Sequence, residues 1–320
     1  MIGTVGVTNP LPEALRHYQR ELVDTLTRCK ITSSVAAVSA TEGATSRAHK
    51  VRQGLGAIRN VIVTRRRPVR NLQTWPSLGL LELPMWSSTR RHAVVLHDPI
   101  PLRRQIGYDR LSKSIANLPL PNRPTIIVHS QDALEAAKLL LPAFPVVHLP
   151  HPVLTDPTPS AKASRPIVLV AGQYKPERRV DLLGDIGAAL DQRGLRGVVI
   201  GRGWPREING WEGTARFVSE AELSQAIASA TVVVLPYGRY FQSGIAIRAL
   251  ESFTAFVSPQ TSFATELLGE KSPLIVSAPE GAAEYLAAID AALHRGDVEK
   301  RFQEYQAHVD NCWQSFFARS

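Results

Sequence analysis

Hydrophobic and polar positions alternate in short blocks along the chain, and the blocks follow a strand–helix order. Short runs of β-branched and aliphatic residues predict buried strands. These runs are residues 2–7, 34–40, 61–64, 93–96, 125–128, 146–149, 166–171, 195–200, 231–235 and 273–276. Between them, apolar residues recur at three- and four-residue spacing, which predicts helices. The predicted helices are residues 13–26, 132–141, 180–190, 219–229, 282–293 and 297–318, with one more beginning at Gly244.

This order predicts the fold class. Strands alternate with helices twice over, on either side of a Pro- and Ser-rich segment at residues 154–165. We therefore expect an α/β protein with two Rossmann-like domains facing across a cleft. The first domain is predicted at residues 1–153, the linker at 154–165 and the second domain at 166–299. The last helix, at about residues 300–320, is expected to return to the first domain.

Composition indicates a soluble globular protein. Hydrophobic residues make up 44% of the 320 residues and charged residues 20%, which is ordinary for such a protein. No apolar run reaches the roughly 20 residues of a membrane span, and the N-terminus has no signal-peptide pattern. Cys29 and Cys312 are too far apart in the sequence for a zinc motif or a disulfide framework. We expect a cytoplasmic protein, and association with a membrane surface stays open.

The net charge of +9 is uneven, because residues 1–150 hold 20 Lys and Arg against 9 Asp and Glu. An anionic partner, either lipid headgroups or nucleic acid, suits that half. Residues 65–70, RRRPVR, precede an apolar segment between Trp75 and Trp86. Arginines beside tryptophan suit a peripheral membrane contact or a nucleic-acid groove. A core helix beside a solvated arginine loop is the alternative.

The most informative stretch is residues 230–253, ATVVVLPYGRYFQSGIAIRALESF. A buried strand leads through a turn into Gln242, Ser243 and Gly244, where a helix begins. Ser243 can cap that helix, and Gly244 lets the backbone approach a ligand closely. The N–H groups of Gly244, Ile245 and Ala246 then form a phosphate seat. Alternatively, this is an ordinary connection between a strand and a helix.

Two further groups of polar residues stand where ligands bind in open α/β sheets. Glu251 lies eight residues after Ser243, on nearly the same helix face, where a carboxylate can bind ribose hydroxyls. His97 and Asp98 follow the strand at residues 93–96, at the carboxyl edge of the first predicted sheet. His97 can contact a sugar or a phosphate, and Asp98 can act as a base toward an acceptor hydroxyl. His129 and His151 also follow strands and are interpreted as structural.

The stretch from Gly244 to Glu251 resembles the donor-binding region of glycosyltransferases with the B-type fold. It is most similar to the large retaining, nucleotide-sugar-dependent family (group 1, family 4-like), whose pattern is a glutamate, a glycine turn and a second glutamate. Glu251 matches the second glutamate and Gly244 the glycine, whereas Ser243 stands at the first glutamate. The resemblance covers nearly the whole chain, is strongest at residues 166–270 and is thin at residues 31–92.

The resemblance implies further donor-binding residues. Gly172 matches the family's glycine after the first strand of the donor domain, Gln173 replaces the arginine beside it, and Arg178 takes the place of a lysine. Lys175 can supply the charge that Gln173 lacks. In the family, the region of Phe217 and Val218 commonly seats the nucleotide base.

The implied activity is transfer of a sugar from a nucleotide-diphosphate donor to an acceptor hydroxyl. The donor is a co-substrate, and neither a cofactor nor a metal is expected if Arg178, Lys175 and the helix amides stabilise the leaving diphosphate. His97, Asp98 and Arg178 are the candidate catalytic residues. Retention of configuration is implied by the resemblance, whereas Asp98 acting as a base would support inversion. The acceptor is predicted to be a lipid, saccharide or small molecule. One alternative is a phage-type enzyme that glycosylates hydroxylated DNA bases, and another is a degenerate nucleotide-binding or scaffold protein without turnover.

Overall fold

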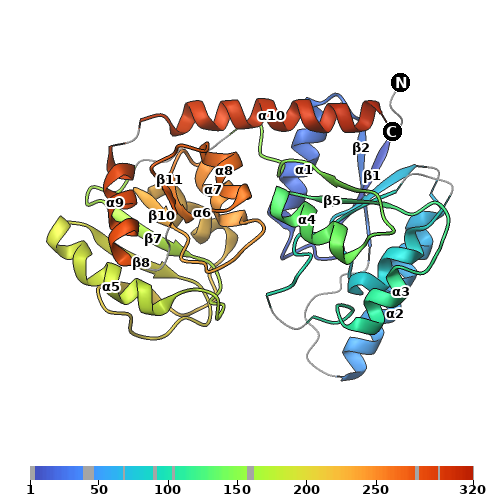
Figure 1. Ribbon diagram of the computed structural model, residues 1–320, viewed down its shortest axis with the longest axis horizontal. Coiled ribbons are helices and arrows are strands. Elements are labelled where there is room, and N and C mark those ends of the chain that lie inside the picture. The colour runs from blue at the N-terminus through green and yellow to red at the C-terminus, as the bar shows by residue number, and fades with distance from the viewer. Residues whose placement is uncertain are drawn as a thin grey trace. The chain divides into compact units, whose positions relative to one another are not determined.

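The computed structural model describes residues 4–38, 47–67, 69–88, 92–102, 105–156, 162–277, 281–294 and 296–319. The chain divides into two compact units (Figure 1). The first comprises Met1–Thr155 and Ala307–Ser320, and the second comprises Asp156–Gln306. Each unit has one six-stranded parallel sheet with helices against it, which confirms the predicted class of two Rossmann-like α/β domains. The assignment of one unit to the acceptor and the other to the donor remains a prediction.

The first sheet has the strand order β2-β1-β3-β4-β5-β6. Its strands are β1 (Val5–Thr8), β2 (Ser33–Ala36), β3 (Arg70–Gln73), β4 (Ala93–Val95), β5 (Thr125–Val128) and β6 (Val146–His148). All pair in parallel, so each connection must cross a face of the sheet. Strands β4 and β5 lie inside the sheet, and all their residues except Thr125 are buried. That burial explains why they are unbroken apolar runs in the sequence.

Helices connect these strands (Figure 1). Helix α1 (Arg16–Arg28) follows β1, and helix α4 (Gln131–Leu140) packs on β5 and β6. Helix α2 (Arg47–Arg65) and helix α3 (Arg110–Ala116) both pack on the 3-10 helix η1 (Gly79–Trp86). The hydroxyl of Ser130 accepts a hydrogen bond from the amide of Ala133 and so caps α4.

One prediction for residues 31–92 is wrong. Val61 to Thr64 was predicted as a strand, but it lies inside α2, where Ala57, Val61 and Thr64 are buried at helical spacing. The β-branched run favours a strand locally, and packing against η1 overrides that propensity.

For the segment ending at Trp86, the sequence left open a membrane or nucleic-acid contact and a helix packed in the core. Trp86 and Leu83 are 0% exposed in a helical segment, which supports the second alternative.

The second sheet has the order β12-β11-β10-β7-β8-β9. Its strands are β7 (Ile167–Ala171), β8 (Arg196–Ile200), β9 (Trp211–Thr214), β10 (Val232–Val234), β11 (Ala255–Pro259) and β12 (Ile275–Val276). Every residue of β10 is buried, because β10 lies between β7 and β11 with helices on both faces. The sequence predicted β10 as a strand buried in this way.

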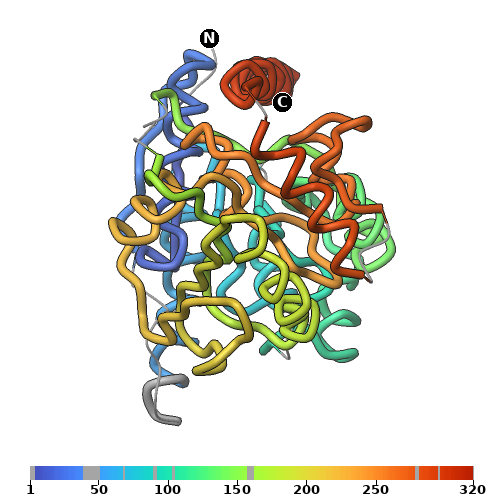
Figure 2. Tube along the Cα trace, turned by 90° about the vertical axis from the view of Figure 1, so that its left-hand side faces the viewer, coloured from blue at the N-terminus to red at the C-terminus, as the bar shows by residue number. Residues whose placement is uncertain are grey.

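Helices flank this sheet as well. Helices α5 (Val180–Leu190) and α9 (Ala282–Leu293) lie side by side on one face (Figure 1, Figure 2). The 3-10 helix η2 (Asp191–Arg193) continues α5. Helices α6 (Glu220–Ser229) and α7 (Gly244–Glu251) contact each other on the other face, and α8 (Ser262–Leu268) follows β11. Ser219 and Glu222 form a reciprocal capping box at the start of α6, which fixes where that helix begins.

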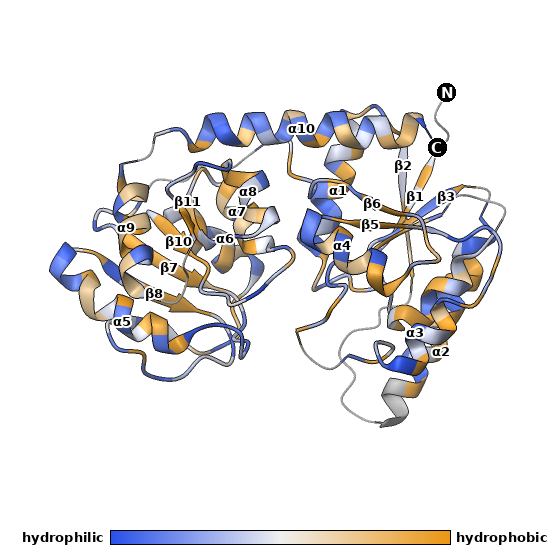
Figure 3. Cartoon of the chain, in the orientation of Figure 1, coloured by the Kyte–Doolittle hydropathy of each residue, from blue (hydrophilic) through white to orange (hydrophobic). Residues whose placement is uncertain are grey.

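The last helix, α10 (Val298–Ala318), has contacts with both parts of the chain. In the second unit, Arg301 donates to the carbonyl of Leu267 over 2.7 Å. In the first unit, Trp313 donates to the carbonyl of Pro150 over 3.0 Å, and Arg28 pairs with Asp310. Apolar and polar residues alternate along α10, whereas the strands of both sheets are mainly apolar (Figure 3). Among the described residues, no helix is both long and apolar enough to cross a membrane.

Candidate functional site

The second unit has a small pocket at the carboxyl end of its sheet. It has a volume of about 160 Å³ and is formed by the segments that follow β7 and β8 and by the segment that leads into α6. Its lining residues are Gly172, Gln173, Ile200, Gly201, Arg202, Phe217, Val218 and Leu223. Four of the residues predicted to bind the donor therefore lie together. Gly172 and Gln173 follow β7, and Phe217 and Val218 precede α6. Ligands of open parallel sheets bind at this edge.

Two of the residues that line the pocket are glycines, Gly172 and Gly201. Gly172 has a φ of +97° and Gly201 a φ of +133°, which other residues rarely adopt. A Cβ atom on Gly201 would lie 2.2 Å from the carbonyl oxygen of Gly172, so the two turns approach more closely than a side chain allows. Trp204 donates to the same carbonyl over 2.8 Å. The backbone at this edge is therefore rigid and open to a ligand.

Arg178 is buried beneath this edge and is 4% exposed. Its Nη1 donates to the carbonyl of Ala171 over 2.8 Å, and its Nη2 donates to the hydroxyl of Tyr237 over 2.6 Å. The guanidinium also lies 5.1 Å from the ring centre of Trp204. Of the three guanidinium nitrogens of Arg178, only Nε has no hydrogen-bond partner among the described residues. Most of the donors that were predicted to bind a diphosphate are thus already used within the protein.

The turn after β7 is joined to the turn after β10 through the backbone. Arg178 and Tyr237 form an isolated antiparallel bridge. The amide of Gly238 donates to the carbonyl of Glu177, and the amide of Arg179 donates to the carbonyl of Pro236, both over 3.0 Å. The segment that leads into α7 is consequently held against the pocket edge.

Helix α7 begins as the sequence predicted, with one difference. The side chain of Ser243 caps it by accepting a hydrogen bond from the amide of Ala246 over 3.3 Å. The Ala246 amide is therefore already paired, which corrects its predicted place in the phosphate seat. The structure gives no hydrogen-bond acceptor among the described residues to the amides of Gly244 and Ile245. A Cβ atom on Gly244 would meet nothing within 4 Å, so this end of the helix faces open space.

The pocket and the start of α7 are neighbours. A Cβ atom on Gly172 would lie 2.9 Å from Nη2 of Arg178 and 3.7 Å from Cδ1 of Ile245. Gly172 thus lies between the pocket and the first turn of the helix. One elongated ligand can contact both, with an aromatic group at Phe217, whose side chain is 73% exposed, and an anion at the helix start.

Two other predicted donor residues lie away from the pocket lining. Glu251 is the last residue of α7 and is 3% exposed, which places it about 10 Å along the helix axis from Gly244 at the usual rise per residue. Gln242 is half-buried and directly precedes the cap. Neither is among the residues that line the pocket.

Of the described cations, the pocket lining contains Arg202, which is exposed. The predicted Lys175 is half-buried in the turn after β7 and is not one of the lining residues. Arg202 follows the glycine turn of β8, and the sequence reasoning did not select it as a ligand. A basic residue directly after a glycine at the end of a strand was the signal that would have identified it.

In the first unit, His97 and Asp98 follow β4 at the carboxyl edge of the sheet. His97 is 4% exposed, and its Nε2 lies 3.0 Å from the carbonyl oxygen of Thr74. Its ring stacks on Trp75, with 5.7 Å between the ring centres. Asp98 is half-buried and lies close enough to Tyr108 to contribute to raising the pKa of that phenol. The structure keeps the two predicted residues at the edge where the sequence placed them.

His97 belongs to a larger buried cluster that sequence reasoning missed. His129 lies 5.8 Å from it between ring centres, and the Nε2 of His129 is 2.8 Å from the hydroxyl of Tyr18. The ring of His151 is 5.0 Å from that of His129. Burial is the main cause that lowers the pKa of His151 to about 3 and holds the pKa of His129 well below its ordinary value. Both rings are neutral at pH 7, and both bond to backbone carbonyls, as expected for structural histidines.

Solved structures with the same fold are glycosyltransferases of the B type. A sucrose-phosphate synthase from Thermosynechococcus elongatus is 13% identical, with a TM-score of 0.65 over 99% of this chain and 100% of that chain. A UDP-forming α,α-trehalose-phosphate synthase from Burkholderia vietnamiensis is 12% identical, with a TM-score of 0.65 over 99% and 96%. The trehalose-6-phosphate synthase OtsA is 11% identical, with a TM-score of 0.66 over 99% and 98%.

These likenesses establish that the chain has the glycosyltransferase-B fold, and they confirm at the level of the fold the resemblance drawn from the sequence. No family model matches the sequence, and no curated protein matches it.

Proposed function

We propose that the protein is a glycosyltransferase that moves a sugar from a nucleoside diphosphate sugar to an acceptor hydroxyl. The observation that carries the proposal is the position of Gly172 between the pocket and the first turn of α7. A nucleoside diphosphate has an aromatic base at one end and anionic phosphates at the other. This edge offers an exposed aromatic ring at one end and two available amides at a helix start at the other.

On the donor side, the base stacks on Phe217 and contacts Val218 and Gln173, and the phosphates receive the amides of Gly244 and Ile245. Lys175 and Arg202 supply positive charge. As the bond between the anomeric carbon and the diphosphate breaks, charge accumulates on the leaving phosphate, and fixed cations and amides stabilise it. Arg178 positions the backbone at Gly172 and Tyr237 rather than binding the phosphate with its whole guanidinium.

The acceptor oxygen forms the new bond to the anomeric carbon and loses its proton. We assign the uptake of that proton to Asp98 or to the leaving phosphate, and a sugar-binding role to His97. The acceptor is a lipid, saccharide or small molecule. Ser243 and Gln173 stand in place of charged residues of the family, and the donors of Arg178 are mostly occupied. These departures favour a second candidate function, a nucleotide-binding protein without turnover.

Isothermal titration calorimetry with UDP, GDP and ADP, and then with the corresponding nucleotide sugars, tests the donor site. We expect one nucleotide to bind. Lys175→Gln and Arg202→Gln should each weaken its binding by about tenfold or more, since hydrogen bonds to charged groups contribute about 1.5–3 kcal/mol. Arg206→Gln is the matched control, because Arg206 is an exposed arginine of the same unit outside the pocket lining.

Release of nucleoside diphosphate from the bound sugar distinguishes the enzyme from the second candidate. Binding with slow hydrolysis that an acceptor accelerates supports transfer. Binding without release under any acceptor, including glycosylatable DNA, supports the protein without turnover. If no nucleotide binds, or if Arg206→Gln weakens binding as much as Lys175→Gln, the donor site proposed here is wrong.

A further inference from the structure

Helix α2 has an apolar face that the described residues of its own unit leave exposed. Val51 and Leu55 are 64% and 63% exposed, and Ile58 and Ile62 are 37% and 39% exposed. These four residues are separated by four, three and four positions, so they form one line along the helix. The opposite side of α2 packs on the sheet through Ala57, Val61 and Thr64. Figure 3 shows that apolar residues recur along this helix on the outside of the unit.

A line of arginines runs directly beside the apolar line. Arg52 and Arg59 are exposed and lie seven residues apart on the helix, which keeps them on one side of it. At 100° per residue, both project next to Leu55 and Ile62. Arg66, seven residues further, is exposed in the turn that follows the helix. The surrounding sequence is strongly basic, because residues 43–81 contain eight Lys and Arg and no Asp or Glu.

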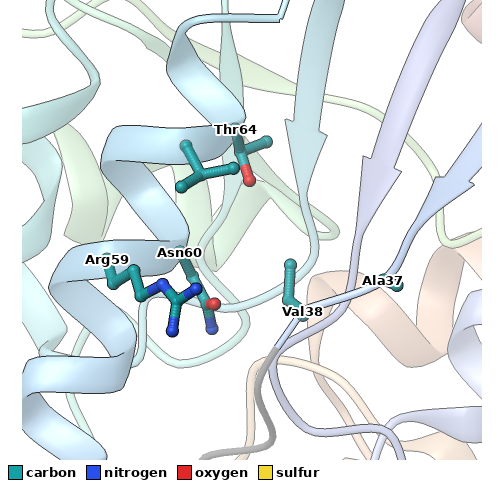
Figure 4. Close-up of a pocket in the computed structure, with 6 residues that line it drawn as sticks. Ala37, Val38, Arg59, Asn60 and Thr64 are labelled. Atoms are coloured by element: carbon teal, nitrogen blue, oxygen red, sulfur yellow. The ribbon is translucent and has the colours of Figure 1, made fainter.

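A pocket opens beyond the arginine line. It has a volume of about 310 Å³ and is lined by Ala37, Val38, Arg59, Asn60, Val63 and Thr64. Figure 4 shows the side chains of Arg59, Asn60 and Thr64 along the helix side of the pocket, with Val38 and Ala37 on the other. Thr64 is 1% exposed, and its hydroxyl has no hydrogen-bond partner among the described residues.

We propose that this face of α2 binds the surface of an anionic phospholipid bilayer. The line of Val51, Leu55, Ile58 and Ile62 enters the boundary between headgroups and acyl chains, and Arg52, Arg59 and Arg66 contact phosphates. Exposed Ile106 and Leu111, beside and on α3, extend the apolar surface, since α3 and α2 both pack on η1.

Other occupants fit this face less well. A second copy of the chain would bring the arginine lines of two helices together with no acidic residue in either segment to compensate. A DNA backbone suits the arginines, but it would leave a central line of four aliphatic side chains facing phosphates. At the surface of a bilayer, the apolar line can contact acyl chains while the arginine line contacts headgroup phosphates. The proposal stands independently of the donor site, because it uses only residues of the first unit.

Flotation of the full chain with vesicles tests the proposal. The vesicles contain phosphatidylcholine alone or with about 30% phosphatidylglycerol. At that anionic content, each arginine near the surface should strengthen binding about fivefold. Arg52→Gln/Arg59→Gln/Arg66→Gln should therefore reduce binding to the anionic vesicles by about a hundredfold. The charge-matched control is Arg16→Gln/Arg20→Gln/Lys138→Gln, which removes three exposed cations of the same unit on α1 and α4.

The apolar line has an equally close control. Leu55→Gln should weaken binding about tenfold, because it removes a leucine from the bilayer. Leu139→Gln changes the same residue type at a site that is 80% exposed on α4, a helix that packs on β5 and β6, and should leave vesicle binding unchanged.

Three results would overturn the proposal. The first is no flotation with anionic vesicles while the thermal unfolding profile is intact. The second is equal loss of binding in Leu55→Gln and Leu139→Gln. The third is tighter binding to a short DNA duplex that depends on the three arginines and not on Leu55, which would identify a nucleic-acid surface. None of these results depends on nucleotide binding, so a failure here is distinguishable from a failure of the donor site.

Discussion

Arg178 donates a hydrogen bond to the hydroxyl of Tyr237 over 2.6 Å, and its guanidinium lies 4.8 Å from the centre of the same ring. This pair joins the turn after β7 to the turn after β10, and the backbone bridge between the same two residues reinforces it. The sequence resemblance assigns Arg178 to the donor phosphates, whereas its contacts make it a residue that positions the site. Its substitution must therefore be interpreted through stability first.

Arg178→Ala should destabilise the second unit before any ligand is added. It leaves the Tyr237 hydroxyl and the Ala171 carbonyl buried without this donor, and each such loss costs about 1–3 kcal/mol. Tyr237→Phe should cost about 1–3 kcal/mol, because one guanidinium N–H is left unpaired. Urea unfolding measures both, and Arg206→Ala, at an exposed arginine, should change the free energy of unfolding by less than about 0.5 kcal/mol. Wild-type stability in Arg178→Ala would contradict the positioning role.

Gly244→Ala separates ligand binding from stability. The new methyl group meets open space in the free protein, and replacing glycine by alanine where the backbone suits alanine stabilises by about 0.4–1 kcal/mol, because it restricts the unfolded chain. The same methyl group lies where a phosphate would approach the first turn, so nucleotide binding should weaken by about tenfold or more, the equivalent of about 1.4 kcal/mol. Gly184→Ala in α5 is the control, since a Cβ atom there also meets nothing within 4 Å. Unchanged nucleotide affinity in Gly244→Ala would exclude this helix end as the phosphate seat.

Most of the fold could be predicted from local pattern, because buried parallel strands are continuous apolar runs and the connecting helices have an apolar face. Thr125–Val128 and Val180–Leu190 agree with the predicted bounds of strand and helix. Strands with mixed composition were missed. Strand β3 has the sequence RNLQ and β9 has WEGT, and these depend on sheet neighbours rather than on their own hydrophobicity.

The candidate site was only partly predictable for a similar reason. The residues that line the pocket follow strand ends, a position that a sequence reveals, so Gly172, Gln173, Phe217 and Val218 were all selected. The sequence could not show that Tyr237 and Trp204 would occupy the guanidinium of Arg178, because those contacts join segments 26 and 59 residues away. The exposed face of α2 was missed because residues 61–64 were interpreted as a strand.

Glu82 should give the first unit an unusual pH dependence. It is 0% exposed, and burial raises its pKa to about 7 despite hydrogen bonds from Gln73, Trp86 and Leu78. Because the folded pKa is above the unfolded value, this carboxyl group stabilises the fold at low pH. The contribution is complete below about pH 4.5 and is lost as the pH rises through about 7. A shift of that size corresponds to about 3 kcal/mol.

Urea unfolding of Glu82→Gln at pH 5 and pH 8 measures this contribution. Relative to the wild type, the variant should gain stability between pH 5 and pH 8, because it has no buried carboxylate to ionise. Glu135→Gln, at an exposed site on α4, should follow the wild-type profile. A constant difference between Glu82→Gln and the wild type at both pH values would show that Glu82 does not titrate in this range.

The two cysteines should differ sharply in reactivity. Cys29 is 5% exposed, its Sγ lies 3.4 Å from the carbonyl oxygen of Asp310, and burial with the nearby Asp310 carboxylate raises its pKa to about 11. Its thiolate fraction at pH 8 is therefore about one thousandth, and the thiolate is the reactive form. Cys312 is half-buried on α10. An aromatic disulfide reagent at pH 8 should modify one thiol per chain quickly and the second only after denaturation. Cys312→Ser should remove the fast thiol and Cys29→Ser should retain it, whereas two thiols reacting at one rate would show that α10 does not cover Cys29 in solution.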